Sequence, residues 1–498
     1  MKTLKERYEK LSQIRRPYLD RARDAAKLTI PSLIPEEGDN ETTGFSTPWQ
    51  SVGSRGTNNL ASKILLALFP PNSAFFRMSV DDVDRMNMDE ASKGEIDEAL
   101  ASVERVITQD IESSKFRSTM YQAARHLIVA GNGLLYDAED GMRHYPLHRY
   151  VIQRDADGTV YQIIATDKTV FELLSDELKA ALIASEESSA PKDDDAEVTI
   201  YTGVRRDGKK WKVHQEVEGV MVPGSEHEYK IDETPWIPLR PIALDGESYG
   251  RGYIEELYGD LNTVDILTQA VTEGASIAAL VKFLVDPNGV TKKDDLIDTQ
   301  NGGFAEGRDQ DISTLRVDKG GDLRVAYESM QGISERLGYA FLLSSAARRD
   351  AERVTAEEIR FVAQELEDAM GGIYSVLSQE LQMPLVKWRI KKLQKGGKLP
   401  PLPKEVTTEI ITGLEALGRG HEHQRLRAFV GDANQNVGPE VLAEYLSVSE
   451  YLKRTAAALN IDTKGLVRTE EEVQQSRQQQ AQQQAQLQAQ VQAAGRQQ

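Results

Sequence analysis

Apolar residues recur every three or four positions along most of the chain, which is the period of an α-helix buried on one face. The first such stretch starts at Leu4 and holds Pro17, where we expect a kink. The next ends at Pro70–Pro71, as a helix should. The first predicted helix ends at a turn-rich break at 29–40, and the second spans about 52–69. Residues 91–135 are predicted to be mainly helical as far as Gly131–Asn132–Gly133. The later predicted helices lie at 253–285, about 329–343 and 356–395, and within 405–470.

Two stretches instead alternate between apolar and polar positions, which indicates β-strands. YVIQRDADGTVYQIIAT (150–166) holds Asp157–Gly158, and VTIYTGVRRDGKKWKVHQEV (198–217) holds Asp207–Gly208. Asp-Gly between β-favouring flanks is a hairpin signal, because glycine takes the positive φ that tight turns need. The polar stretch 290–327 is Gly-rich and only partly strand-like. We therefore predict an α+β fold that is mainly α-helical, with a small β-rich part.

One long helix carries clear signals at its start and its end. Thr355 and Glu358 have the spacing of a capping box, in which each side chain satisfies a backbone amide of the first turn. Gly396–Gly397 should terminate the helix about 60 Å further on, at 1.5 Å per residue. Gly371–Gly372 and Pro384 are costly inside a helix, so we predict bends at both places.

Length and composition limit the class of protein. A chain of 498 residues should hold more than one folded unit. The absence of cysteine excludes disulfides and thiol chemistry. No apolar run follows the opening residues, so we expect no signal peptide. The most apolar stretch, KILLALF (63–69), is far shorter than the roughly 18 residues of a membrane span. We expect a cytoplasmic protein, or a component of a particle assembled in the cytoplasm.

Motifs for catalysis are missing from the sequence. No G-x-x-x-x-G-K-[ST] phosphate loop, no G-x-S-x-G and no H-E-x-x-H occurs. His421 and His423 are two residues apart, and on a helix such residues do not face each other. Asp193–Asp194–Asp195 lies in an acidic loop, where solubility is the simplest role. We therefore predict no enzymatic activity, no cofactor and no metal site.

Charge raises a different question. The net charge is −19, which argues against a conventional nucleic-acid binder. Arg348, Arg349 and Arg353 nevertheless gather just before the long helix, among Asp350 and Glu352. These residues alone predict a loop between helices with local ion pairs and a net charge of only +1. A ring of subunits would multiply this weak positive patch around a channel.

Long stretches of the chain resemble a known family. The strings are TPWQSVGSRGTNNLASKILLALFP, DGESYGRGYIEELYGDL, ERVTAEEIRFVAQELEDAMGGIYSVLSQELQMPLV and ITGLEALGRG. In this order they resemble the head-to-tail connector, or portal protein, of short-tailed, podovirus-type bacteriophages, over about residues 5 to 470. The resemblance implies a dodecameric ring at one capsid vertex, in the virion, through which double-stranded DNA is packaged and ejected. It implies no activity of its own, since a separate terminase hydrolyses ATP.

The resemblance also implies a division of the chain, in which the long kinked helix belongs to the wing and the Gln-rich tail lies outside the family. The implied parts are the wing (1–250), the first stem helix (251–285), the clip (286–328), the second stem helix (329–343), the tunnel loop (344–355), the long kinked helix (356–400), the crown (401–470) and a Gln-rich C-terminal tail (471–498).

Partners and site residues follow from the same resemblance. The implied partners are the terminase large subunit, the tail adaptor protein, and the capsid, scaffolding and internal core proteins, with no membrane. Arg348, Arg349 and Arg353 would face the passing DNA from the tunnel loop, and Gly371–Gly372 would bend the long helix. A capsid shell or scaffolding protein is the alternative, since such proteins are also acidic and self-assembling. A nuclease or packaging ATPase is disfavoured by the missing phosphate loop and metal ligands.

Overall fold

The computed structural model describes most of the chain before residue 344 and separate parts beyond it. The described residues are 3–40, 42–70, 75–80, 90–113, 115–138, 141–184, 193, 195–279, 282–300, 302–315, 320–343, 361–362, 364–366, 368–369, 376–403, 406–410, 418–438, 442, 445–448, 451–452 and 455. They belong to two compact units. The first comprises 1–65, 114–350 and 369–388, and the second comprises 66–113, 351–368 and 389–498. The fold is α+β and mainly helical, as predicted.

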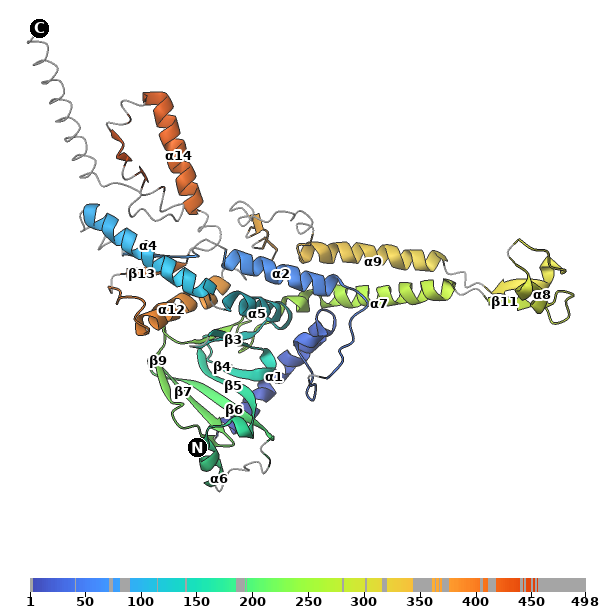
Figure 1. Ribbon diagram of the computed structural model, residues 1–498, viewed down its shortest axis with the longest axis horizontal. Helices are drawn as coiled ribbons and strands as arrows, with labels where there is room; N and C mark the ends of the chain where they lie inside the picture. Colours follow the sequence, from blue (N-terminus) through green and yellow to red (C-terminus); the bar gives the residue numbers. More distant parts are fainter. Residues whose placement is uncertain are drawn as a thin grey trace, which may run out of the picture. The chain divides into compact units, whose positions relative to one another are not determined.

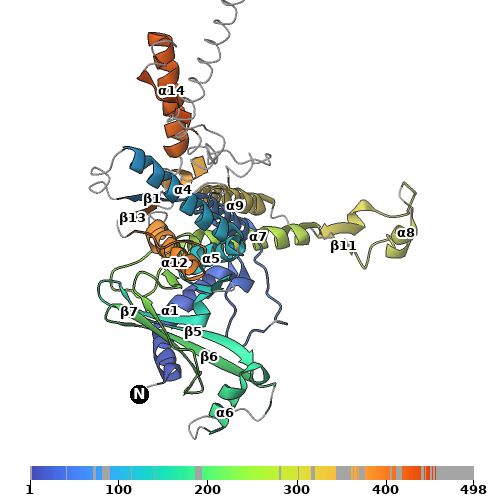
Figure 2. The ribbon, with the colours of Figure 1, turned by 60° about the vertical axis from the view of Figure 1, so that its left-hand side comes forward.

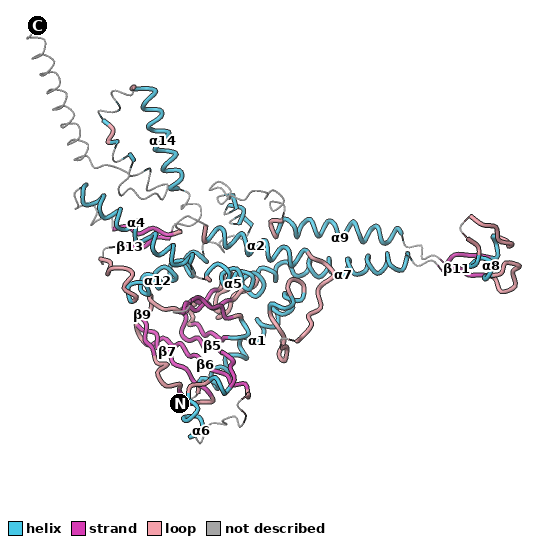
Figure 3. Tube along the Cα trace, viewed as in Figure 1, coloured by secondary structure: helices cyan, strands magenta, loops and turns pink. Residues whose placement is uncertain are grey.

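The first unit contains an antiparallel sheet of six strands. They are β4 (Tyr150–Arg154), β5 (Val160–Val170), β6 (Glu197–Asp207), β7 (Lys210–Val217), β8 (Val220–Met221) and β9 (His227–Lys230). The order is β4-β5-β6-β7-β8, with β9 also paired to β7, and Figure 3 shows these strands together. Both predicted hairpins are confirmed. Gly158 and Gly208 have φ of +77° and +58° in their turns, as the Asp-Gly signal requires.

Helix α1 (Leu4–Lys27) packs on a face of this sheet and continues through Pro17. Leu4 and Leu11 form a buried cluster with Val151 and Ile164 of the sheet. A β-carbon on Gly203 would lie 2.6 Å from the Leu4 side chain, so glycine permits the close approach of α1. Leu4 and Leu11 of the predicted apolar face are therefore buried by the sheet, whereas Ile14 of the same face is about half exposed.

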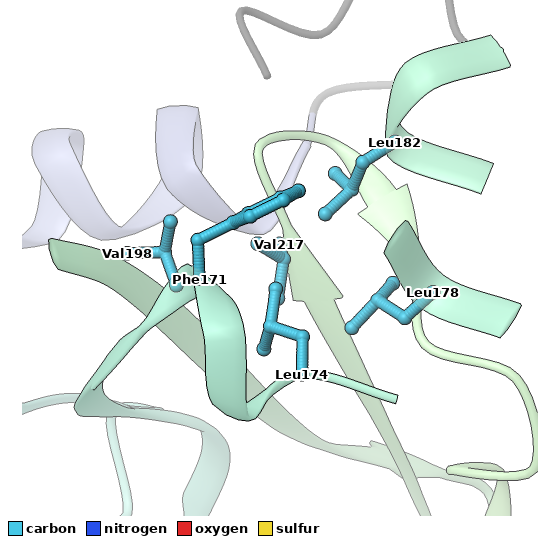
Figure 4. Close-up of a cluster of buried hydrophobic side chains, with 6 residues drawn as sticks. All are labelled: Phe171, Leu174, Leu178, Leu182, Val198 and Val217. Carbon is cyan, nitrogen blue, oxygen red and sulfur yellow. The ribbon is translucent and has the colours of Figure 1, made fainter. Parts of the chain in front are cut away.

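A second apolar cluster closes one end of the sheet (Figure 4). It brings together η3 (Phe171–Leu173), α6 (Asp176–Ala184) and the strands β6 and β7. The buried side chains are Phe171, Leu174, Leu178, Leu182, Val198 and Val217. Leu178 and Leu182 are four residues apart, so they lie on one face of α6 and point at the sheet. This packing holds the short helix, which is too short to be stable alone.

A three-stranded antiparallel sheet packs beside helix α5 (Phe116–Ala130), whose end at Gly131 was predicted. Its order is β10 (Trp236–Leu239), β2 (Gly133–Ala138) and β3 (Gly141–Tyr145), and η2 (Leu147–Arg149) follows it. Trp236 stacks on Tyr136 across β10 and β2, with ring centroids 4.2 Å apart. The sequence did not predict these three strands, because each is short and two of them pair with strands that are not their chain neighbours.

Two helices of the first unit differ from the prediction. Helix α7 (Tyr253–Ala279) stops before residue 285, and residues 282–285 form strand β11 (Lys282–Val285), which pairs with β12 (Ile312–Leu315). Helix α9 (Gly320–Ala340) starts well before residue 329. The predicted bounds were wrong because KFLV suits either a helix or a strand, and because Gly320–Gly321 concealed the start of α9 in a Gly-rich stretch. Pairing with β12 made residues 282–285 a strand, and packing on α7 decided where α9 starts.

The remaining elements of this unit complete the described part of the chain before residue 344. They are η1 (Pro31–Leu33), α2 (Val52–Leu68), α8 (Lys293–Asp298) and η4 (Asp309–Asp311). The bounds of α2 match the prediction, and its residues up to 65 belong to the first unit. The two ends of the region between β11 and β12 are joined by Asp311. Its carboxylate accepts hydrogen bonds from the backbone N and the Oγ1 of Thr291, at 3.1 and 2.9 Å.

The predicted long helix is described at 361–362, 364–366 and 368–369, which are helical, and again from residue 376. A π-helical turn, η6 (Ser378–Gln382), leads into α12 (Met383–Lys395). Pro384 has no N–H to donate to the preceding turn, and the wider π turn accommodates this loss. This π turn lies directly before Pro384, and the bend predicted there stays a prediction. The predicted end is confirmed, since Gly397 has φ of +68° directly after α12. Gly371, Gly372, Thr355 and Glu358 lie outside the described residues.

The second unit pairs segments far apart in the sequence. Strand β1 (Phe76–Val80) pairs antiparallel with β13 (Val406–Ile410), and α4 (Glu90–Ser113) and α14 (Gly418–Val437) also belong to it. Glu104 of α4 accepts the backbone N–H of Met78 at 2.7 Å, and Asp110 pairs with the buried Arg389 at 2.7 Å. A helical reading of 406–410 was therefore wrong. The β-branched residues of VTTEI find a strand partner more than 300 residues earlier.

Candidate functional site

Two long antiparallel helices, α7 and α9, form a hairpin that Figures 1 and 2 both show side by side. At the end where α7 begins and α9 finishes, here called the root, Leu261, Val264, Leu337 and Phe341 are almost completely buried. Further along, the helices approach closely at Gly274, where a β-carbon would lie 2.6 Å from Leu323. The far ends of the two helices lead to β11, α8 and β12.

The start of α7 is fixed to the end of α5 by a backbone crossing. Asn132 donates to the carbonyl of Gly250 and accepts the N–H of Gly250, at 2.9 and 2.8 Å. A β-carbon on Gly131 would lie 2.1 Å from the backbone of Arg251, and one on Gly252 would lie 2.3 Å from the carbonyl of Val129. Only glycine fits such an approach without displacing a backbone. The direction in which α7 leaves the sheet-bearing body is therefore strongly determined.

Charged side chains reinforce this crossing. Arg251 forms a bidentate pair with Glu247, at 2.6 and 3.0 Å, and also reaches Glu255 in the first turn of α7. Its guanidinium lies 5.6 Å from the ring centroid of Tyr18, which in turn packs on Tyr249. The stretch DGESYGRGYIEE therefore forms a tight, ion-paired turn into α7.

The hairpin is acidic along its length. Helix α7 carries five carboxylates and no lysine or arginine, and α9 carries three carboxylates and two arginines. Arg324 pairs with Glu328 at 2.9 Å, and Arg336 pairs with Asp260 at 3.0 Å. Both arginines of the two helices are thus already matched by carboxylates. Such a surface repels a polyanion and forms few phosphate contacts, on which tight nucleic-acid binding depends.

Away from the root, the hairpin exposes large apolar side chains. Ile266 and Ile277 of α7 are more than half exposed, as are Val325 and Tyr327 of α9. Exposed apolar surface of this kind marks a protein–protein interface. One subunit alone therefore leaves uncovered a surface that another protein chain would bury.

All residues that the sequence analysis named as site residues lie outside the described residues. Arg348, Arg349 and Arg353 belong to the segment that follows Leu343, the last described residue at the root. The structure thus describes the exit toward this segment and says nothing of the arginines themselves. Their role stays a prediction.

Three histidines of the first unit have little exposure to water: His126 is buried, and His144 and His148 are half-buried. The rings of His126 and His144 are 4.7 Å apart between centroids. Burial lowers the pKa of His144 to about 3 and that of His148 to about 4, and nearby positive charge adds to this effect. Burial also lowers the pKa of His126. Among the described residues no group of three His, Asp or Glu side chains is placed to hold a metal ion.

Two further sequence candidates lie at least partly within the described residues. His421 and His423 lie within α14, whose backbone alone is described there. Asp193 and Asp195 lie in a loop before β6, with the N–H of Asp195 donating to Asp193. None of the described helices has the length and hydrophobicity that a membrane crossing requires.

Comparison with known proteins identifies the family. The family model for the bacteriophage head to tail connecting protein matches residues 1–467. The chain is 43% identical to the portal protein of Enterobacteria phage T3 over 484 residues, covering 94% of this chain and 89% of that protein. It is 42% identical to the portal protein of Escherichia phage T7, covering 94% and 88%. The portal protein of Enterobacteria phage SP6 is 34% identical, with 94% and 90% covered.

The chain therefore belongs to the bacteriophage head-to-tail connector, or portal, family. Its role is that of the portal ring at a capsid vertex, and it is a structural component of the virion at the connection between head and tail. The resemblance seen in the sequence is confirmed over almost the same residues.

Sequence reasoning missed the residues that anchor the hairpin. Asn132 and Asn59 are polar residues that the hydrophobic pattern treats as ordinary helix-end or helix-surface positions. Their partners, Gly250 and Phe341, lie more than 100 residues away in the sequence. A cluster of Gly and Asn at the ends of predicted helices was the only signal available.

Proposed function

We propose that twelve copies of this chain form a closed ring whose α7–α9 hairpins line a channel for double-stranded DNA. The observation that carries this proposal is the hairpin itself, with its fixed root, its acidic surface and its uncovered apolar side chains. In a ring, the apolar side chains of one hairpin meet those of the next. The family membership supports the same arrangement.

The acidic surface suits a channel through which DNA must slide. Each phosphate that a lysine or arginine holds strengthens binding and slows movement. A wall with an excess of carboxylates repels the duplex uniformly, and only a few cations are then needed to touch it. Arg348, Arg349 and Arg353, in the predicted tunnel loop, are our candidates for these contacts. Twelvefold repetition would turn a net charge of +1 per subunit into a positive band.

The remaining predicted roles follow the order of the chain. Residues 286–328 are proposed as the clip, which docks the terminase large subunit during packaging and the tail adaptor protein afterwards. Residues 1–250 are proposed as the wing, which meets the capsid, scaffolding and internal core proteins, and 401–470 as the crown. Assembly in the host cytoplasm belongs to the same proposal, as does the absence of catalytic activity.

Electron microscopy of the purified chain tests the ring. We expect closed rings with a central hole near the roughly 20 Å width of a duplex. Curved sheets or shells would favour the alternative, a capsid shell or scaffolding protein, because such proteins form lattices and no closed ring of one size. ATP hydrolysis by the purified rings would contradict the structural role.

Substitution of the arginines tests the DNA contact. We expect a phage with Arg348→Ala and Arg349→Ala to assemble normal rings but to change in DNA packaging, retention or ejection. A matched control is Arg324→Ala on α9, because that arginine is paired with Glu328. Unchanged behaviour of the double variant in all three steps would refute the DNA-facing role and leave the ring untouched.

A further inference from the structure

The chain leaves helix α9 through a fully satisfied exit. The N–H of Leu343 donates to the carbonyl of Gly338 at 2.8 Å, and the N–H of Leu342 donates to that of Tyr339 at 3.0 Å. These two bonds define a Schellman motif, the common C-terminal cap of a helix. The Tyr253 hydroxyl, from the start of α7, donates to the carbonyl of Ala340 at 3.2 Å.

The last two carbonyls of this exit are held by one side chain from another helix. Nδ2 of Asn59, on α2, donates to the carbonyl of Phe341 at 2.9 Å and to that of Leu342 at 3.0 Å. Backbone carbonyls at a helix end need partners when water is excluded. With Asn59 in place, every carbonyl from Leu337 to Leu342 has a hydrogen-bond donor.

Helix α2 is pressed directly against this exit. A β-carbon on Gly56 would lie 2.2 Å from the ring of Phe341, which is completely buried. The loop before α2 is also tied to α7, because Asp265 accepts the backbone N–H of Gln50 at 3.1 Å. Helix α2 therefore contacts the end of α9, the loop before it contacts α7, and α2 holds Asn59 in register with the end of α9.

The residue that Asn59 holds has an unusual backbone. Leu342 has φ of +52°, and it is one of two non-glycine residues with positive φ among those that the structure describes. Glycine is the usual residue at this position of a Schellman motif, because a β-carbon disfavours the left-handed conformation. Leu342 needs surrounding contacts to keep this conformation. Asn59 supplies one on each side of the Leu342 α-carbon, at the carbonyls of Phe341 and Leu342.

We propose that Asn59, seated by Gly56, is a positioning residue that fixes the direction in which the chain leaves α9 toward Arg348 and Arg349. This inference rests on the proposed DNA-facing role of that segment, and it adds the residue on which its placement depends. The left-handed Leu342 turns the chain at the root, and Asn59 keeps that turn from relaxing. Asn59 touches no DNA in this role.

Limited trypsin digestion of the unassembled full chain tests the proposal, because trypsin cuts after Arg348, Arg349 and Arg353 and reaches them where no ring encloses them. We expect Asn59→Ala to speed cleavage after these arginines about five- to tenfold, as loss of one shared side-chain donor predicts. The matched control is Asn58→Ala. Asn58 is the adjacent residue of the same type, and its Oδ1 accepts a hydrogen bond from Tyr121 of α5 at 3.2 Å, away from the exit.

A second substitution separates positioning from general stability. Asparagine tolerates the left-handed conformation better than leucine. Leu342→Asn should therefore slow the cleavage by about twofold on its own, and it should restore slow cleavage when combined with Asn59→Ala. Equal cleavage rates for Asn59→Ala and Asn58→Ala would overturn the proposal. If Asn59→Ala fails to fold, an unchanged or faster rate in the unassembled Leu342→Asn chain would overturn it instead.

The two proposals fail in different ways. A phage with Asn59→Ala should change in DNA retention or ejection in the same sense as the Arg348→Ala, Arg349→Ala phage. If the arginine variant behaves normally but Asn59→Ala still speeds cleavage, the DNA-facing role is wrong and the positioning role stands. If the arginine variant is defective but cleavage does not change, the positioning role is wrong alone.

Discussion

At its root the α7–α9 hairpin is buried, and hydrogen bonds between side chains and backbone groups hold it to the body. Away from the root the same helices are largely exposed. Tyr253, Asn132 and Asn59 each hold a backbone group that a helix end would otherwise leave open. Away from the root, the polar contacts are mainly surface ion pairs such as Arg324–Glu328. Surface pairs contribute little stability, so contacts with neighbouring hairpins in the proposed ring would add to the stability of the far part.

The contrast separates two tasks. The root sets a direction and must do so in every subunit, which requires glycines and fixed hydrogen bonds. In the proposed ring, the remainder of the hairpin presents an acidic surface and joins a neighbour, which requires only surface composition. Substitutions at the root should therefore damage folding, and substitutions further along should have small or even favourable effects on the single chain.

The largest effect is expected for Gly131→Ala. Gly131 has φ of +66°, and a β-carbon there would meet the backbone of Arg251 at 2.1 Å. Because a backbone cannot rotate away as a side chain can, we expect a loss of about 3 kcal/mol or more in the free energy of unfolding. Urea unfolding followed by circular dichroism measures it. A loss below about 1 kcal/mol would show that the crossing is less rigid than described.

Acid should destabilise the body that carries the root. His144 and His148 have pKa values of about 3 and about 4 in the folded state, below the ordinary value of 6.5. The unfolded chain therefore binds more protons below pH 6.5. Stability that is present above pH 6.5 is lost as the pH falls toward 4, by up to roughly 1.4 kcal/mol per pH unit for each histidine.

Urea midpoints between pH 7.5 and 5 measure this dependence. His144→Asn should give a shallower dependence, because one of the titrating groups is gone. A midpoint that is unchanged over this range would contradict the burial of the histidines.

A smaller effect is expected for Tyr253→Phe. The substitution removes the hydroxyl that donates to the carbonyl of Ala340 and leaves the ring in place. We expect a loss of about 1 kcal/mol in the free energy of unfolding, which is typical of one hydrogen bond. Tyr258→Phe is a suitable control, because Tyr258 lies on the same helix and is 39% exposed. Equal losses in both variants would argue against the role of the Tyr253 hydroxyl.

The smallest effect, of opposite sign, is expected for Gly332→Ala. Gly332 is an exposed position of α9, and a β-carbon there meets no atom within 4 Å. Alanine favours the helix over glycine by about 0.5–1 kcal/mol, so the free chain should become more stable. Thermal unfolding of unassembled chain measures the gain. Ring formation should be followed alongside, since a stabilised chain that no longer assembles would place a neighbouring subunit against this position.

Hydrophobic period and turn residues sufficed to predict several elements. Helix α2 ends where Pro70–Pro71 require it, the two Asp-Gly hairpins form, and Gly396–Gly397 follow the end of α12. Each of these signals is local, because proline and glycine restrict or free the backbone regardless of what packs against it. The family resemblance, carried by long strings of residues, added the portal role.

Signals that depend on distant partners were not predictable in the same way. Strand β13 exists because β1 pairs with it, and KFLV became a strand because ISTL pairs with it. Likewise, nothing near Asn59 in the sequence shows that its side-chain amide donates a hydrogen bond at the end of α9, a helix that begins more than 250 residues later. The chemistry of an asparagine is fixed by the sequence, but its partner is fixed only by folding.

The sequence by itself determined that this is an acidic, mainly helical, cysteine-free chain of the portal family with arginines at 348, 349 and 353. Only the tertiary structure decided which helices form the hairpin root and which atoms hold the exit from α9. The physical reason is that periodicity records which face of a helix is buried, whereas hydrogen bonds between distant backbone and side-chain groups depend on three-dimensional proximity. Such bonds determine direction, and direction is what a channel-lining segment needs.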